Sequence, residues 1–316
     1  MKIPSKVFPY RIPYMGSKQN IAYSIMMAIA QKKPKAKYFF DIFGGGAAMS
    51  LMAKQFGLKV YYTEKNAGIV NLLNFLKDNK IPKDWIRWIT REEFKSCLGK
   101  DDPFSVFVTV VWSFGNNRQA YLFGKDIEEL KRLAFEVIVH QDYGCLEKLK
   151  SQTGLNLRMP TESKLHDRRL NFSKQIKIKG FNGGCMQPMR RVQEIEQIAM
   201  QQSLTQLECC SRLQQLEYLQ QLEYLNGLSY DNDEVIIYCD PPYRGTAEYT
   251  DNGFNHNEFD DWVRKLKYDV FISEYNTPFE KIATFGKLSL LNNSKETKTM
   301  KQENLYMHKT EIKNEN

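Results

Sequence analysis

Apolar residues along the chain fall into short runs that alternate between strand-like and helix-like patterns. Residues 36–43 (AKYFFDIF) form a buried strand-like run that ends at glycines. Residues 47–57 (AAMSLMAKQFG) follow with helical spacing, and Gly57 is a suitable end signal. Residues 59–66 (KVYYTEKN) then predict a second strand and residues 67–79 (AGIVNLLNFLKDN) a second helix. This order predicts the start of a doubly wound α/β sheet.

The same rhythm resumes in the last third of the chain. Residues 235–238 (VIIY) predict a buried strand, and residues 257–267 (NEFDDWVRKLK) predict an amphipathic helix. Residues 268–276 (YDVFISEYN) predict another strand, and residues 303–308 (ENLYMH) a late strand in an otherwise polar tail. The α/β pattern therefore occurs on both sides of a middle region that does not show it.

Two segments have ambiguous patterns. Residues 104–112 (FSVFVTVVW) are apolar and rich in β-formers, which favours a strand, but their periodicity also allows a buried helix. Residues 213–225 (LQQLEYLQQLEYL) are a tandem hexapeptide with leucine at every third position. Because a helix has 3.6 residues per turn, these leucines drift around its surface. The repeat predicts a broadly apolar helix that passes into a strand near residues 225–230.

Length and composition narrow the class of protein. The chain has 316 residues, 42% of them hydrophobic, which suits one large domain with an insertion better than several small domains. No apolar run approaches membrane-spanning length, and the N-terminal MKIPSKVFPY lacks a signal-peptide core. A cytoplasmic location is expected. The six cysteines form no C-x-x-C pair, so neither a metal site nor a disulfide framework is predicted.

The net charge of +8 is concentrated in one segment. Residues 148–191 contain eleven Lys or Arg and two acids, Glu162 and Asp167, so this basic block carries +9 and the rest of the chain is nearly neutral. A local basic block suggests a surface for a polyanion. A solvated basic loop is an equally good interpretation of the charge alone.

Three glycines separate the first predicted strand from its helix in DIFGGGAAMS, residues 41–50. Glycine permits close approach of the backbone to a ligand, and the helix N-terminus offers free N–H groups. Glu64 ends the second strand, where a carboxylate could accept hydrogen bonds from two ribose hydroxyls. The spacing fits neither G-x-G-x-x-G nor a P-loop, so a dinucleotide and ATP are disfavoured as the nucleotide-like cofactor. A plain tight turn is an equally good interpretation of the glycines and Glu64 by themselves.

A strand ends at Asp240 in YCDPPYRGTAEY, residues 238–249. An amine on an aromatic base is a poor nucleophile because its lone pair is delocalised into the ring. The Asp240 carboxylate and the Pro241 carbonyl could accept its two N–H groups and expose that lone pair, while Pro242 stiffens the turn. Tyr243 offers a ring on which a base flipped out of a duplex could stack. A proline-rich turn with a surface tyrosine is the alternative.

These motifs, in this order, resemble the Dam-type DNA N6-adenine methyltransferases, most closely the phage-borne members. The resemblance rests on RIPYMGSKQNI, DIFGGGAAMS, TEKN, WSFGNNRQAYLFG, YCDPPY and FISEYN. It implies a Rossmann-like S-adenosylmethionine-dependent core with an inserted target-recognition region. The implied boundaries are a cofactor-binding half at 1–115, the insertion at 116–205 and a catalytic half at 206–316.

The resemblance also assigns roles to individual residues. Catalysis is expected from Asp240, Pro241, Pro242 and Tyr243. Cofactor contacts are expected from Tyr14, Gly16, Lys18, Asp41, Phe43, Gly44, Gly45, Gly46, Glu64, Asn66 and Asp240. The family often has another glycine at the position of Ala47, where alanine is expected to do little harm, and aspartate at the position of Glu64.

The basic block lies in the interval that holds the target-recognition part of this family. Double-stranded DNA is the implied partner, with phosphate or loop contacts from Asn116, Asn117, Arg118, Lys148, Arg158, Arg168, Arg169, Lys174, Arg190 and Arg191. A cognate restriction endonuclease is a candidate second partner, no membrane is expected, and a monomer is the default state. The recognised sequence, and a role in restriction–modification, phage protection or regulation, stay open.

Four alternatives compete with methylation of adenine in DNA. A cytosine-C5 enzyme needs a thiolate, usually in a Pro-Cys pair, which this chain lacks; Cys239 precedes the Asp240 turn and should point to the opposite face. Cytosine-N4 methylation follows the same logic, but Asp240 rather than serine favours adenine. RNA as the substrate and a degenerate, non-catalytic DNA-binding copy are further alternatives.

Overall fold

The computed structural model describes residues 1–8, 10–176, 187–199, 208–209, 218–244, 254–288 and 300–310. The chain divides into two compact units. The first contains Met1–Arg11, Ser17–Val70 and Gln202–Asn316, and the second contains Ile12–Gly16 and Asn71–Gln201. Most of the predicted insertion at 116–205 falls in the second unit, which however begins earlier, at Asn71.

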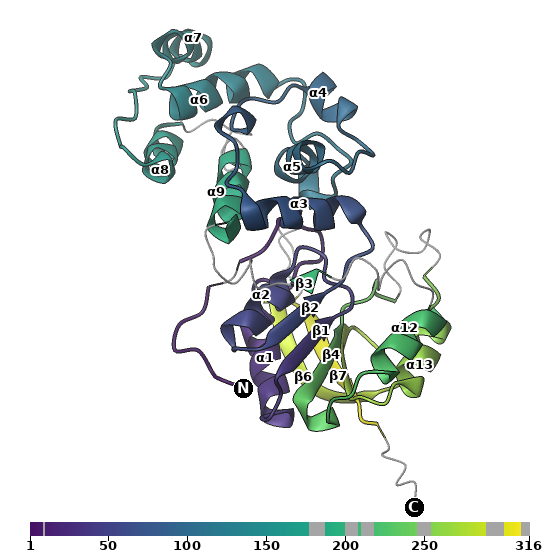
Figure 1. Ribbon diagram of the computed structural model, residues 1–316. Coiled ribbons are helices and arrows are strands. Elements are labelled where there is room, and N and C mark those ends of the chain that lie inside the picture. Colours follow the sequence, from purple (N-terminus) through teal and green to yellow (C-terminus); the bar gives the residue numbers. More distant parts are fainter. Residues whose placement is uncertain are drawn as a thin grey trace, which may run out of the picture. The chain divides into compact units, whose positions relative to one another are not determined.

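One sheet organises the first unit (Figure 1). Within the described residues its strand order is β3-β2-β1-β4-β5-β7-β6. The strands are β1 (Tyr38–Asp41), β2 (Lys59–Tyr62), β3 (Glu208–Cys209), β4 (Val235–Cys239), β5 (Val270–Glu274), β6 (Glu280–Leu288) and β7 (Met300–His308). The strands from β3 to β5 pair in parallel, while β7 is antiparallel to both β5 and β6.

Helices cover both faces of this sheet. Helices α1 (Ala22–Lys32) and α2 (Ala48–Gln55) lie on one face, and α12 (Tyr218–Asn226) and α13 (His256–Lys265) lie on the other (Figure 1). Alternate strand residues supply the two cores, because successive side chains of a strand point to opposite faces. Phe40 and Ile237 pack with Trp262 of α13, whereas Phe39 stacks on Tyr238 away from that cluster. The result is a mixed α/β unit with a mostly parallel sheet, compatible with the predicted Rossmann-like class.

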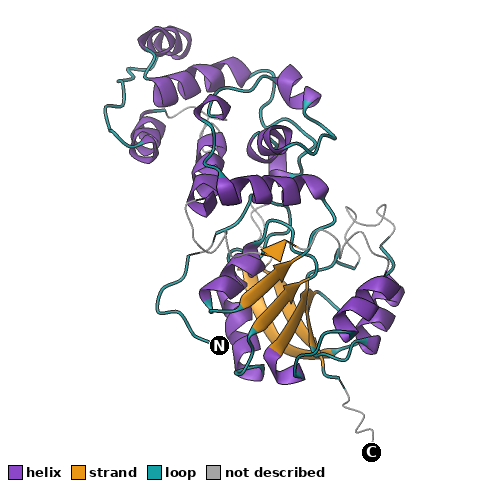
Figure 2. Ribbon diagram, viewed as in Figure 1, coloured by secondary structure: helices purple, strands orange, loops and turns teal. Residues whose placement is uncertain are grey.

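The second unit is helical, and Figure 2 draws strands only in the first. Besides the C-terminal part of α3 (Ala67–Asp78), its helices are α4 (Arg91–Ser96), α5 (Pro103–Val111), α6 (Glu128–His140), α7 (Tyr143–Thr153), α8 (Leu165–Gln175) and α9 (Gln187–Ala199). Short 3-10 turns occur at Lys83–Trp85 and Phe114–Asn116 here, and at Asn232–Glu234 in the first unit. Its core is aromatic: Trp112 contacts the rings of Trp88, Phe123 and Phe135.

Two stretches that the sequence left open as strands are not strands. Of the two structures allowed for residues 104–112 the helix is the one observed: α5 ends at Val111 and Trp112 follows it, while Asp102 caps the helix by accepting a hydrogen bond from Ser105 N at 2.9 Å and Pro103 stands in the first turn. Residues 225–230 are not a strand: α12 continues to Asn226, and Gly227 N then donates to Glu223 O at 2.8 Å. The beginning of the hexapeptide repeat, 213–217, and residues 177–186 of the basic block lie outside the described residues.

The other predicted elements are confirmed, including the strand–turn–helix around the three glycines, helix α13 and the late strand β7. Gly57 has a φ of +79° just after α2, as expected for a residue that ends a helix. Across the described ranges, no helix is both long enough and apolar enough to span a membrane.

Candidate active site

The predicted motifs lie at the carboxyl ends of the parallel strands. The glycine turn, Gly44–Gly46, follows β1, Glu64 follows β2, and the Asp240–Tyr243 turn follows β4. Strands β1 and β4 are parallel neighbours, with Asp41 paired to Tyr238, so their carboxyl ends meet at the same edge. The chain leaves β1 toward β2 on one side and β4 toward β5 on the other. Ligands of open α/β sheets bind at such a switch point.

Close packing fixes the glycine turn. A Cβ on Gly44 would lie 2.1 Å from the Tyr62 ring, so only glycine fits there without a shift. Tyr62 OH in turn donates to Gly45 O at 2.7 Å. Ala47, which directly precedes α2, has a φ of +62°. This left-handed conformation strains an alanine and suits a glycine, so Ala47 carries a backbone cost.

Glu64 binds the glycine turn from the end of β2. Its Oε2 accepts a hydrogen bond from Gly45 N at 2.7 Å, and its Oε1 accepts one from Asn66 N at 2.9 Å. Asn66 caps the following helix, since its Oδ1 accepts from Ile69 N at 3.2 Å. The Glu64 carboxylate thus links the glycine turn to the start of the following helix.

Asp41 is buried beneath the same turn. Its Oδ2 accepts a hydrogen bond from Ser50 Oγ at 2.6 Å, and its Oδ1 has no hydrogen-bond partner within the part of the chain described. Burial, with smaller contributions from the charges of Asp240 and Glu64, raises the pKa of Asp41 to about 7. Phe43 closes this region through edge contacts with the rings of Phe254 and Phe259, at 5.8 Å between centroids.

The Lys18 cluster comprises Lys18, Asp240, Tyr243 and Glu303. Lys18 Nζ lies 2.6 Å from each oxygen of Asp240 and 3.2 Å from Glu303 Oε1. It also lies 4.7 Å from the centroid of the Tyr243 ring. Burial alone would lower the pKa of Lys18, but the charges of Asp240 and Glu303 outweigh it and raise that pKa. The ammonium is therefore a fixed positive charge beside Asp240.

Contacts on both sides hold the tyrosine of the Asp240–Tyr243 turn. Tyr243 OH donates to Glu303, and its ring packs edge-on against Tyr275 at 4.6 Å between centroids. Pro241 is buried and Pro242 is half-buried. The two prolines restrict the backbone of the turn, and the contacts with Glu303 and Tyr275 fix the Tyr243 side chain.

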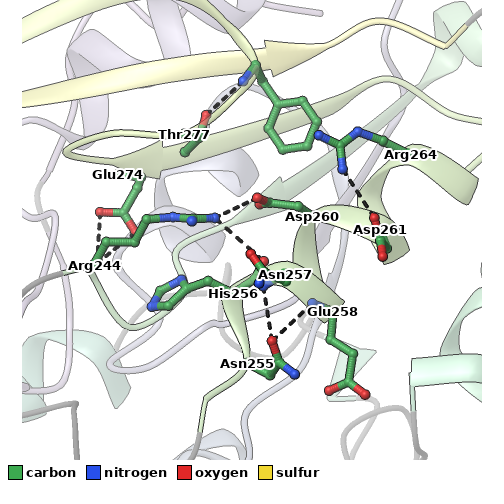
Figure 3. A network of polar contacts seen from close by, with 11 residues as sticks. Arg244, Asn255, His256, Asn257, Glu258, Asp260, Asp261, Arg264, Glu274 and Thr277 are labelled. Carbon is green, nitrogen blue, oxygen red and sulfur yellow. Dashed lines mark hydrogen bonds and ion pairs between the residues drawn. The ribbon is translucent and has the colours of Figure 1, made fainter.

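Arg244, the residue directly after this turn, is held by two carboxylates (Figure 3). Its backbone N–H donates to the carboxylate of Glu274 at 3.1 Å, and its guanidinium donates to Asp260 Oδ2 of α13 at 2.6 Å. Glu274 is buried at the end of β5 and also accepts from Tyr275 N at 2.7 Å. Burial raises the pKa of Glu274 to about 7, although these backbone hydrogen bonds act to lower it.

Sequence reasoning assigned no role to Arg244, Glu274 or Glu303. Glu274 stands within FISEYN and Arg244 directly after the Asp-Pro-Pro-Tyr motif, so both had a local signal. Glu303 is the first residue of the predicted late strand, residues 303–308, where no motif signals a site.

The structure places the predicted DNA-contacting residues in the second unit, with varied exposure. Arg158 and Arg190 are exposed, and Arg190 pairs with Glu194 at 3.0 Å. Arg168 is half-buried and donates to Val139 O at 3.2 Å. The other predicted residues are half-buried or exposed apart from Arg191: Asn116, Asn117, Arg118, Lys148, Arg169 and Lys174.

The prediction of a phosphate contact for Arg191 is wrong. Its side chain is buried, and its guanidinium donates to Val111 O at 2.8 Å and Ser113 O at 2.7 Å. These carbonyls stand at the C-terminal end of α5, where they lack helical partners. Arg191 therefore stabilises the helical unit. Tyr14 and Gly16 also belong to the second unit, and their predicted cofactor contacts stay predictions.

Comparison with known proteins adds no identification: no protein-family model matches the chain, and no curated protein matches it. The chemistry must therefore be argued from the geometry. Cys239 bears on the cytosine alternative: it is buried with the α13-facing core, and burial raises the pKa of its thiol far above the ordinary value. A buried, protonated thiol is not an activated nucleophile.

Proposed function

We propose that the chain is an S-adenosylmethionine-dependent DNA methyltransferase that acts on adenine N6. The observation that supports this most is the arrangement of the strand ends: the glycine turn with Glu64, and the Asp240–Tyr243 turn, follow strands of the same parallel set, and β1 and β4 are neighbours. On this proposal the sheet is a methyltransferase core, and the second unit recognises double-stranded DNA.

The residues around the glycine turn fit a nucleoside-type cofactor. Glu64 places a carboxylate beside this turn, where its two oxygens accept the N–H groups of Gly45 and Asn66, and a carboxylate after the second strand is the kind of group that binds ribose hydroxyls. Asp41 adds a buried Oδ1 that has no partner among the described residues. Phe43, the glycine turn and Glu64 would hold S-adenosylmethionine, which when bound supplies an electrophilic methyl group.

Asp240 and Pro241 prepare the nucleophile. The Asp240 carboxylate and the Pro241 carbonyl accept the two N–H groups of the adenine amine, which draws the nitrogen toward tetrahedral geometry and exposes its lone pair. Tyr243 stacks the flipped base, and Glu303 and Tyr275 hold that ring in place. As the nitrogen gains a methyl group it develops positive charge, which Asp240 stabilises.

The Asp240→Asn variant tests this role. The amide keeps the size of the side chain but removes the negative charge, so we expect the turnover rate to fall by about 100- to 1,000-fold. Affinity for S-adenosylmethionine, measured by calorimetry, should change only a few-fold. Asp269→Asn is the matched control, because it removes a carboxylate from another buried lysine pair, 2.6 Å from Lys33, at the opposite edge of the sheet.

Normal turnover of Asp240→Asn would contradict the mechanism. Transfer to cytosine N4 by the wild type would keep the mechanism and change the target base. No transfer and no cofactor affinity in the wild type would favour a non-catalytic, degenerate copy.

A further inference from the structure

Glu303 reaches the candidate active site because β7 runs against its neighbours. In the sheet register Asn304 pairs with Glu274, the last residue of β5, and Glu303 is one step beyond it. The N-terminal part of β7 therefore lies beside the carboxyl ends of the parallel strands. Glu303 is only 2% exposed there, and within the described residues its carboxylate meets two groups of the Lys18 cluster.

The first of these groups is Tyr243, whose hydroxyl donates to Glu303 Oε1. The second is the Lys18 ammonium, 3.2 Å from the same oxygen. One carboxylate of β7 thus ties the N-terminal lysine to the tyrosine of the Asp240–Tyr243 turn. A carboxylate buried to this degree is costly unless it is paired, and here both partners belong to the site.

Lys18 poses a problem for the proposed chemistry. It contacts both oxygens of Asp240 at 2.6 Å and lies 4.7 Å from the centroid of the Tyr243 ring. These are the acceptors and the ring that the target amine and base must use. A base that donates to Asp240 competes with Lys18 for these oxygens, and a buried ammonium is costly unless a second counter-ion stays beside it.

We infer that Glu303 is a positioning residue that holds Lys18 and Tyr243 while Asp240 receives the target amine. This inference rests on the proposed function. Glu303 keeps the ammonium paired when Asp240 turns to the base, and it fixes the Tyr243 hydroxyl so that the ring stays in its stacking position. It acts through these two residues and does not touch the reacting atoms.

The Glu303→Gln variant tests whether Glu303 positions Lys18 and Tyr243 for catalysis or only stabilises the fold. Glutamine keeps the size of the side chain and can still accept a hydrogen bond from Tyr243, but it loses the charge that holds Lys18. We expect kcat to fall about 10- to 100-fold, the range for loss of a charged hydrogen bond, with KM for S-adenosylmethionine little changed. Asp269→Asn, which removes the buried partner of Lys33, should leave kcat unchanged.

If Glu303→Gln folds poorly, Tyr243→Phe alone still tests the inference, because loss of the hydroxyl that Glu303 holds should lower kcat. Two further measurements test the contacts of Glu303 directly. Tyr243→Phe keeps the ring and every buried charge, and we expect its effect on kcat to be non-additive with that of Glu303→Gln in a double-mutant cycle. The ammonium signal of Lys18 in protein labelled with ¹⁵N-lysine should shift in Glu303→Gln and stay in place in Asp269→Asn.

The outcomes distinguish the inference from the function on which it rests. Wild-type turnover together with an unchanged kcat in Glu303→Gln overturns the inference alone, as does a Lys18 signal that does not move. A strictly additive cycle with Tyr243→Phe overturns the coupling through the hydroxyl. A wild-type protein that methylates no base overturns the proposed function and this inference with it.

Discussion

Replacement of Lys18 by methionine tests the electrostatics of the site without any substrate. Lys18 Nζ lies within 2.6 Å of Asp240 and 3.2 Å of Glu303, so its loss leaves two neighbouring carboxylates without their shared cation. Breaking a buried ion pair by removing one partner typically costs about 3–5 kcal/mol. Because the Asp240 side chain is 19% exposed, water offsets part of that cost, and we expect a loss of about 3 kcal/mol in the free energy of unfolding near pH 8.

The loss should depend on pH in a defined direction. Burial raises the pKa of Glu303 to about 6 even with Lys18 beside it, and loss of the lysine raises that pKa further because Lys18 lowers it. A carboxyl group whose pKa is higher in the folded state stabilises the fold below its unfolded pKa, and loses that contribution as pH rises through the folded value. The deficit of Lys18→Met should therefore shrink as pH falls from about 8 to about 5.

The assay is urea denaturation of wild type and variant, followed by circular dichroism at both pH values. Lys33→Met is the matched control: it removes a buried lysine 2.6 Å from Asp269 and leaves only one carboxylate without its cation. Its deficit near pH 8 should be comparable and should change less with pH. A Lys18→Met deficit below about 1 kcal/mol near pH 8, or one of equal size at both pH values, would refute the reasoning.

Further predictions follow from other parts of the molecule. Since burial raises the pKa of Asp41 to about 7, its contribution to stability should fall as pH rises from about 4 to about 8, and Asp41→Asn should flatten the unfolding free energy over that range. Gly44→Ala places a Cβ 2.1 Å from the Tyr62 ring and should lower the melting temperature; an unchanged value would contradict the packing of the glycine turn. Arg191→Met should lose about 2–4 kcal/mol of stability through two unpaired carbonyls, without changing the salt dependence of DNA binding. Wild-type affinity for duplex DNA should fall steeply with salt in fluorescence anisotropy, because phosphate contacts release counterions, and a flat profile would argue against a basic DNA surface.

Elements with a clear apolar run or helical period within their own residues could be predicted from the sequence. The runs that became β1, β2, β4 and β5 are apolar and short, and α13 has a clear helical period. Residues 104–112 show no helical period because Ser105 to Val111 of α5 are all buried, so periodicity left strand and helix open. In the structure, the Asp102 cap and Pro103 mark the start of the helix. Strand β6 was not predicted, since its sequence, EKIATFGKL, does not alternate cleanly.

Some residues of the candidate site could likewise be predicted from short motifs, whereas the contacts between distant residues could not. Asp240, Tyr243, the glycine turn and Glu64 stand in short motifs, and the sequence placed them correctly at strand ends. The Lys18–Asp240 pair joins residues 222 positions apart, and the Tyr243–Glu303 contact joins residues 60 positions apart. Contacts of this range follow from the sheet order and the reversed direction of β7, which no local periodicity records. Arg191 shows the converse limit, because a basic composition does not distinguish an exposed arginine from one that caps a buried helix end.

The proposed methyl transfer to adenine N6, with Asp240 as acceptor for the amine, can be tested in one experiment. The purified protein is incubated with unmethylated duplex DNA and S-adenosylmethionine carrying a trideuterated methyl group, and the nucleosides are analysed by mass spectrometry. We expect trideuterated N6-methyladenine with the wild type and none above background with Asp240→Asn. No labelled base with a folded wild type that binds S-adenosylmethionine, or equal label with both proteins, would contradict it.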